Sequence, residues 1–283
     1  MWIISSLIYA LTNALYINYN DHRHYNGYIL GIWRGFGVSL LTAPLLLTVP
    51  INLSVDYIAI LIFQGILIGI YDSRIFFASA KFGGHTGSGF ISTAVLITTF
   101  LWWAIEFNDL KKLLLKPQLF ITIILILSAY SISYWQMMRT KVNKRAEQYL
   151  YPAVFALSLM SIATRYIALR GGTLYAGIIY YLTIACFVSG IYNTIMYFKN
   201  KKTTEYAATY PTIRDSIWLI SFSTILIAAK TAAMRLCDNP GYVVAVLLLS
   251  PLIAEIIETH RLKMNYVKLS NLLFLIILLL IIN

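Results

Sequence analysis

Charged residues are scarce in this chain, because Asp, Glu, Lys and Arg together make up 12% of its 283 residues. An ordinary soluble domain carries about 25% of such residues. Hydrophobic residues, by contrast, account for 59% of the sequence. This composition excludes a typical soluble domain and indicates a protein that lies in a membrane.

Cysteine and histidine are also rare. The two cysteines, Cys186 and Cys237, are too few for a disulfide framework or a zinc-binding spacing. The four histidines all fall in predicted loops: His22, His24, His85 and His260. The sequence has no HExxH motif and no Asp-rich cluster, so it lacks the reactive residues that an intramembrane lipid enzyme would need. We therefore expect no metal, no cofactor and no enzymatic activity.

Long apolar runs are what the chain has in abundance. Their length of roughly 17–25 residues is that of membrane-spanning helices, and they lack the period-two alternation of barrel strands. The sequence predicts an all-α membrane protein with ten transmembrane helices. The expected helices cover residues 2–18, 28–49, 57–80, 87–106, 118–138, 149–169, 173–198, 212–236, 241–258 and 267–283.

Two internal matches indicate a repeat. The segment "IEFNDLKKLLLKPQ" (105–118) aligns with "IETHRLKMNYVKLS" (257–270), and "ASAKFGGHTG" (78–87) aligns with "AAMRLCDNPG" (232–241). They predict a first five-helix repeat at residues 1–138, a basic linker at 139–148 and a second five-helix repeat at 149–283. Because five is odd, the second copy would be inverted in the membrane, which is the design that transporters use for alternating access.

The basic residues exceed the acidic ones by 22 to 11 and gather at the ends of apolar runs. Examples are "RTKVNKR" (139–145), "KNKK" (199–202) and "HRLK" (260–263). Cations in these places set membrane topology and meet anionic lipid headgroups, so we expect membrane lipids and no nucleic acid as partners. Most of them lie in the loops that follow odd-numbered helices. The positive-inside rule therefore predicts that both termini lie outside the cytoplasm. We expect the membrane to be the cell inner membrane.

Several stretches resemble the EamA-type members of the drug/metabolite transporter (DMT) superfamily. They are "RGFGVSLLTAP" (34–44), "FFASAK" (76–81), "SPLIAEIIE" (250–258) and the glutamates Glu106 and Glu258, each followed by a short apolar closing helix. The resemblance extends over nearly the whole chain. It implies a ten-helix inverted repeat that transports metabolites, and it implies termini inside the cell. The two predictions for the termini disagree, and we follow the one from the charge distribution, since it comes from the residues of this chain.

Six ionisable residues fall inside the apolar runs: Arg34, Asp72, Arg74, Arg165, Lys230 and Glu255. A charge at the bilayer centre costs about 2.5–3.5 kcal/mol on insertion scales, so such residues usually face a bundle interior or a watery cavity. The cationic excess favours a substrate that carries a carboxylate or a phosphate. Two alternatives remain: the acids form structural bridges with the cations, and Arg34 and Arg165, near helix ends, extend to the interface.

Asp72 and Arg74 point about 200° apart on a helix that turns 100° per residue, so only one of them can face the bundle centre. We predict Arg74 as the cavity residue, and we expect Asp72 to be held by a cation or a hydroxyl donor from an adjacent helix. Tyr71 and Trp33 are candidates for stacking on the substrate. The complete predicted substrate-binding set is Arg74, Lys230, Asp72, Glu255, Asn13, Tyr71, Trp33 and Arg34.

These observations favour a secondary transporter that moves a small polar metabolite, anionic or zwitterionic, by alternating access. A coupling ion or an exchanged metabolite would be its second partner, and it would act as a monomer or a dimer. A lipid flippase or an intramembrane lipid-modifying enzyme is the alternative. Purified protein in liposomes separates these classes, because an enzyme converts its substrate whereas a transporter only relocates it.

Overall fold

A computed structural model describes residues 1–21, 23–50, 54–83, 93–117, 120, 128, 141–200, 211–237, 239–250, 253 and 256. Every regular element in these residues is helical. This result confirms the all-α prediction for the described part of the chain. The predicted helices at 118–138 and 267–283 lie outside the described residues, apart from single positions in the first of them.

The described helices follow the apolar runs in chain order. The first half contains α1 (Trp2–Asn18), α2 (Gly27–Thr42), the 3-10 turn η1 (Ala43–Thr48), α3 (Val55–Phe82), α5 (Ala94–Ile105) and α6 (Phe107–Leu114). The second half contains α8 (Lys141–Arg170), α9 (Leu174–Tyr180), the π-helical segment η2 (Tyr181–Ala185), α10 (Cys186–Asn200), α11 (Ile213–Leu236), α12 (Pro240–Val246) and the 3-10 turn η3 (Leu247–Leu249).

Five helical segments are long and apolar enough to cross a membrane. They are Gly27–Thr48, Val55–Phe82, Arg145–Arg170, Leu174–Asn200 and Ile213–Leu236. At 1.5 Å per residue, even the shortest of them exceeds the roughly 30 Å of a bilayer core. The structure therefore supports a multi-pass integral membrane protein.

Capping residues in the sequence explain where five of the ten described α-helices begin. The side chains at the N-caps of α2, α3, α9, α11 and α12 each accept a hydrogen bond from a backbone N–H of the first turn. These caps are Asn26, Ser54, Thr173, Thr212 and Asn239. Such caps satisfy backbone donors that have no partner within the helix.

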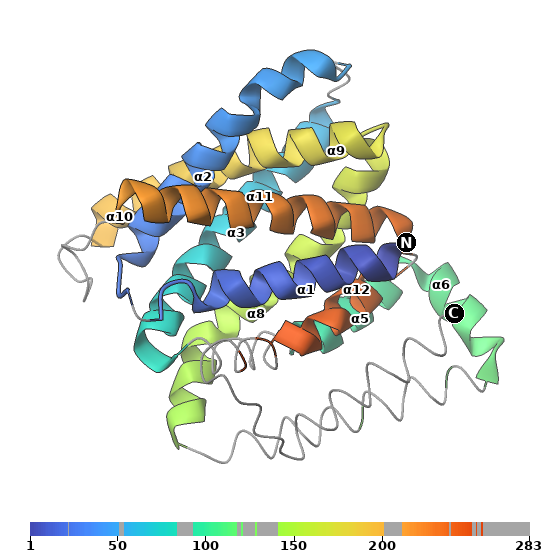
Figure 1. The fold of residues 1–283 in the computed structure, drawn as a ribbon. Coiled ribbons are helices and arrows are strands. Elements are labelled where there is room, and N and C mark those ends of the chain that lie inside the picture. The colour runs from blue at the N-terminus through green and yellow to red at the C-terminus, as the bar shows by residue number, and fades with distance from the viewer. Residues whose placement is uncertain are drawn as a thin grey trace.

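Among the described residues, three helix pairs form the largest contacts: α3 with α8, α2 with α10, and α1 with α11. Figure 1 shows α1 running alongside α11. Glycines at a four-residue spacing, Gly27, Gly31 and Gly35, allow α2 to approach its neighbours closely. A Cβ added at Gly35 would lie 2.5 Å from the backbone nitrogen of Gly190 in α10. No larger residue fits at this crossing unless the two backbones separate.

Two helical stretches differ from the sequence-based expectation. Helix α8 begins at Lys141, so most of the predicted linker is part of a 30-residue helix. Helix α6, of eight residues, occupies a stretch that was expected to be a loop, with Asp109, Lys111 and Lys112 among its residues. Both stretches are polar or amphipathic, and a search for apolar runs does not detect helices of that kind.

Candidate functional site

The centre of the bundle holds a buried ion pair between Arg34 and Asp72. Arg34 comes from α2 and is 3% exposed, and Asp72 comes from α3 and is 1% exposed. The Arg34 Nη1 atom lies 3.2 Å from Asp72 Oδ2. From α1, the Tyr16 hydroxyl donates a hydrogen bond of 2.7 Å to Asp72 Oδ1. Asp72 thus has both kinds of partner expected for it, a cation and a hydroxyl donor from adjacent helices.

The alternative that Arg34 extends to the membrane interface does not fit the structure, in which this residue is 3% exposed. Its side chain points into the bundle, where Asp72, Tyr16, Tyr181 and Cys186 all lie within electrostatic range. If Arg34 pointed away, the Asp72 carboxylate would stay buried without a counter-charge, which is strongly unfavourable. Arg34 and Asp72 tie α2 to α3 at membrane depth.

Lys230 of α11 is the second buried cation of this cluster. It is 1% exposed, and its Nζ atom lies 5.8 Å from the centre of the Tyr9 ring. Arg34 is near enough for its positive charge to act on Lys230. Within the described part of the chain, no group accepts a hydrogen bond from Lys230 Nζ. The described cluster therefore contains two cations and one carboxylate.

A chain of neutral polar groups extends the cluster along α1. The Tyr71 hydroxyl donates to Asn13 Oδ1 over 3.3 Å, and Asn13 Nδ2 donates to Ser250 Oγ over 3.4 Å. Ser250 Oγ in turn donates to the carbonyl oxygen of Ala10 over 2.9 Å. These bonds join α1 and α3 to the segment that follows η3.

A second polar group lies where α3, α8 and η2 meet. Gln64 Nε2 donates to Thr164 Oγ1 over 3.1 Å and also to the Tyr181 hydroxyl. All three residues are buried. Since Tyr181 is also in electrostatic range of Arg34, this group adjoins the ion pair. The interior polar groups thus connect helices of both halves of the chain.

The structure brings together most of the predicted substrate-binding residues, namely Arg34, Asp72, Lys230, Asn13 and Tyr71. It places the other described candidates elsewhere. Trp33 is 45% exposed. Arg74 is half-buried, with its guanidinium carbon 4.9 Å from the centre of the Tyr149 ring. Glu255 lies outside the described residues.

Tyr9 and Tyr16 were missed by the sequence analysis. With 21 tyrosines in the chain, residue type alone does not distinguish them. Their spacing from Asn13 was the available signal, because Tyr9, Asn13 and Tyr16 recur at i, i+4 and i+7 and so share one face of a helix. All three are buried on that face.

Arg165 and Arg235 form a reciprocal contact between the ends of α8 and α11. Arg165 Nη1 donates to the carbonyl oxygens of Met234 and Arg235, the latter over 3.0 Å. Arg235 donates to the carbonyl oxygens of Ala168 and Gly172, the latter over 2.7 Å. Each arginine satisfies carbonyls that the end of the other helix leaves without partners. In the structure, Arg165 therefore ties α8 to the end of α11.

The other end of α11 is attached to the connection between α1 and α2. Asp215 accepts a hydrogen bond of 2.8 Å from the Tyr25 hydroxyl, and its Oδ1 atom lies 3.4 Å from Arg23 Nε. Burial and the bond to Asp215 raise the pKa of Tyr25, so this hydroxyl keeps its proton at neutral pH. Helix α11, which carries Lys230, is thus held at both ends.

The arrangement defines a class of protein, a multi-pass integral membrane protein with charged groups buried among its helices. The chain matches no protein-family model, and no curated protein matches it. The particular function must therefore be argued from the site itself.

Proposed function

We propose that this protein is a secondary transporter that moves a small polar metabolite with a negatively charged group across a membrane. Its ten helices would form two inverted five-helix repeats, the plan that the resemblance to the DMT superfamily implies. The observation that carries the proposal is Lys230, a cation buried at membrane depth without a hydrogen-bond acceptor in the described part of the chain. Following the charge distribution, we place both termini outside the cytoplasm.

The position of the cluster supports transport. Ionisable residues at membrane depth are rare because burying them is costly, and those that occur mark substrate and ion pathways in many transporters. Arg34 and Asp72 come from the first half of the chain, whereas Lys230 comes from the second half. Substrate sites of inverted-repeat transporters lie at the interface of the two repeats.

Helix pairing supports the inverted repeat. A shift by five helices maps α1 onto α8, α2 onto α10, and α3 onto α11. The pair α1 with α11 then corresponds to the pair α8 with α3, and the pair α2 with α10 maps onto itself. These are the three largest helix contacts in the described residues. The pseudo-two-fold axis would pass near the crossing of Gly35 and Gly190, which belongs to the self-related pair.

The balance of charge favours an anionic ligand group. Asp72 is occupied by Arg34 and Tyr16, so it does not neutralise Lys230. A carboxylate or phosphate placed beside Lys230 would supply the missing acceptor through a charge-assisted hydrogen bond. It would also gain from the positive charge of Arg34 nearby. On this proposal Asp72 positions Arg34, while Lys230 contacts the substrate.

The experiment that tests the proposal begins with the purified protein in detergent. A thermal-shift screen of amino acids, nucleotides, sugar phosphates and polyamines identifies ligands, because a compound that binds only the folded state raises its stability. Compounds that bind are then tested for uptake into liposomes that contain the wild type, Lys230→Gln or Lys199→Gln. Lys199 is an exposed lysine near the end of α10 and serves as the matched control.

We expect uptake of an anionic compound by the wild type and by Lys199→Gln, and its loss in Lys230→Gln. Uptake by Lys230→Gln at the wild-type rate would contradict the proposed site. Chemical conversion of the compound would favour the intramembrane enzyme, and movement of labelled lipid between leaflets would favour the flippase.

A further inference from the structure

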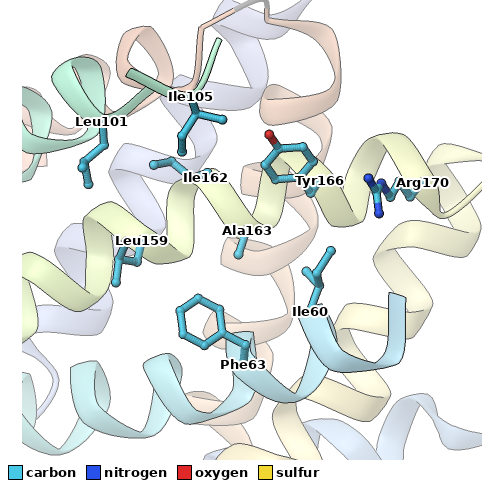
Figure 2. Close-up of a pocket in the computed structure, with 9 residues that line it drawn as sticks. All are labelled: Ile60, Phe63, Leu101, Ile105, Leu159, Ile162, Ala163, Tyr166 and Arg170. Atoms are coloured by element: carbon cyan, nitrogen blue, oxygen red, sulfur yellow. The ribbon is translucent and has the colours of Figure 1, made fainter. Parts of the chain in front are cut away.

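An apolar groove of about 420 Å³ lies between α3, α5 and α8, and neither residue of the buried ion pair lines it. Figure 2 shows Ile60 and Phe63 of α3 on one side, Leu101 and Ile105 of α5 on another, and α8 between them. Ala163 of α8 lies beside this space and leaves room because its side chain is small. The volume falls in the range of about 300–1,000 Å³ that is usual for ligand sites.

Apolar side chains that are partly exposed line the groove, and two of its helices are long enough to cross a membrane. Helices α3 and α8 are both candidate membrane spans. Phe63 and Ile105 are large apolar side chains that stay about half exposed at the mouth of the groove. Seven of the nine lining residues are apolar, so within a bilayer most of this groove suits hydrocarbon rather than a polar solute.

One end of the groove is charged. Arg170 is the last residue of α8, and its guanidinium carbon lies 5.8 Å from the centre of the Tyr166 ring. The Tyr166 hydroxyl is hydrogen-bonded to Glu106, which follows α5. Arg170 is exposed, and it takes no part in the ion pairs found among the described residues. Its place at the end of a candidate span corresponds to the depth of lipid headgroups.

We propose that this groove binds one acyl chain of an anionic phospholipid whose phosphate is held by Arg170. The apolar walls accept the chain, and the planar guanidinium can bind two phosphate oxygens in parallel. Tyr166 orients Arg170 by stacking against it. The site does not depend on the proposed transport activity, because it shares no residue with the cluster around Asp72.

The test uses the purified full chain and phosphatidylglycerol that carries a photoreactive group in its acyl chain. After irradiation, peptide mapping locates the labelled residues. We expect labelling of α3, α5 and α8 around Phe63, Leu101 and Leu159. In Arg170→Gln we expect about fivefold weaker labelling, which corresponds to the roughly 1 kcal/mol that one basic residue contributes near anionic lipid.

Two further variants complete the design. Arg145→Gln removes an exposed arginine from the other end of the same candidate span and should leave the labelling unchanged. Ala163→Phe fills the groove and should abolish labelling there by phosphatidylglycerol and by phosphatidylcholine alike. Excess glycerol 3-phosphate should not compete, because the acyl chain supplies most of the binding.

Three results would overturn the proposal. Equal labelling of Arg170→Gln and the wild type would remove the phosphate contact. Undiminished labelling of a folded Ala163→Phe protein would place the chain outside the groove. Competition by glycerol 3-phosphate would indicate a site for a soluble phosphate ester.

Discussion

Replacing Asp72 by Asn tests the ion pair at the centre of the fold. The substitution keeps the size of the side chain and an oxygen for Tyr16, but it leaves Arg34, at 3% exposure, without a counter-charge. Removing one partner of a buried ion pair costs about 3–5 kcal/mol. We therefore expect Asp72→Asn to lower the free energy of unfolding by about that amount.

The assay is equilibrium unfolding of the purified protein in detergent, with Asp56→Asn as the matched control. Asp56 lies in the exposed first turn of the same helix, where a carboxylate contributes about 0.3–1 kcal/mol by favourable interaction with the helix dipole. The double variant Asp72→Asn with Arg34→Gln removes both charges and should cost less than the sum of the two single variants. The reasoning is refuted if Asp72→Asn costs no more than Asp56→Asn, or if the two single effects simply add.

Three other expectations can be checked with the same preparations. Gly35→Ala should destabilise the protein more than Gly37→Ala in thermal unfolding. The methyl group added at Gly35 meets the backbone of Gly190, whereas the one added at Gly37 meets the movable end of the Ile220 side chain. Equal effects would contradict the close crossing of α2 and α10. Arg235→Gln removes the hydrogen-bond donors to the carbonyls at the end of α8, so the backbone amides of its last turn should exchange hydrogen at least severalfold faster. An unchanged exchange rate would show that this contact contributes nothing to the stability of the helix end. Arg74→Ala tests the sequence-based choice of cavity residue: loss of uptake with normal folding supports it, and uptake at the wild-type rate assigns Arg74 to packing against Tyr149.

The sequence predicted the spanning helices well where hydropathy alone decides. The expected helix at 57–80 corresponds to α3 (Val55–Phe82), and that at 212–236 corresponds to α11 (Ile213–Leu236). Helix α6 and the first turns of α8 were not predicted, because their polar residues resemble those of loops. Whether the complete chain has ten helices stays a prediction, since two of the expected helices lie almost entirely outside the described residues.

The candidate site was predicted in part for a similar reason. A charge inside an apolar run is conspicuous, so Asp72, Arg34 and Lys230 were identified from the sequence. Which of these charges pair with one another depends on how the helices pack, and the hydropathy pattern does not predict that packing. Extension to the interface was left open as an alternative for Arg34 because it lies near the start of its apolar run, yet the structure turns its side chain toward Asp72. Tyr16 was missed because nothing separates it from the other tyrosines.

The most direct test of the central claim measures how an anionic ligand acts on Lys230. The ligand identified by thermal shift is titrated against the wild type and Lys230→Gln, and its uptake into liposomes is followed for both. Our account predicts that the variant remains folded, loses the ligand-induced thermal shift and no longer takes up the compound. An unchanged thermal shift together with unchanged uptake would contradict it.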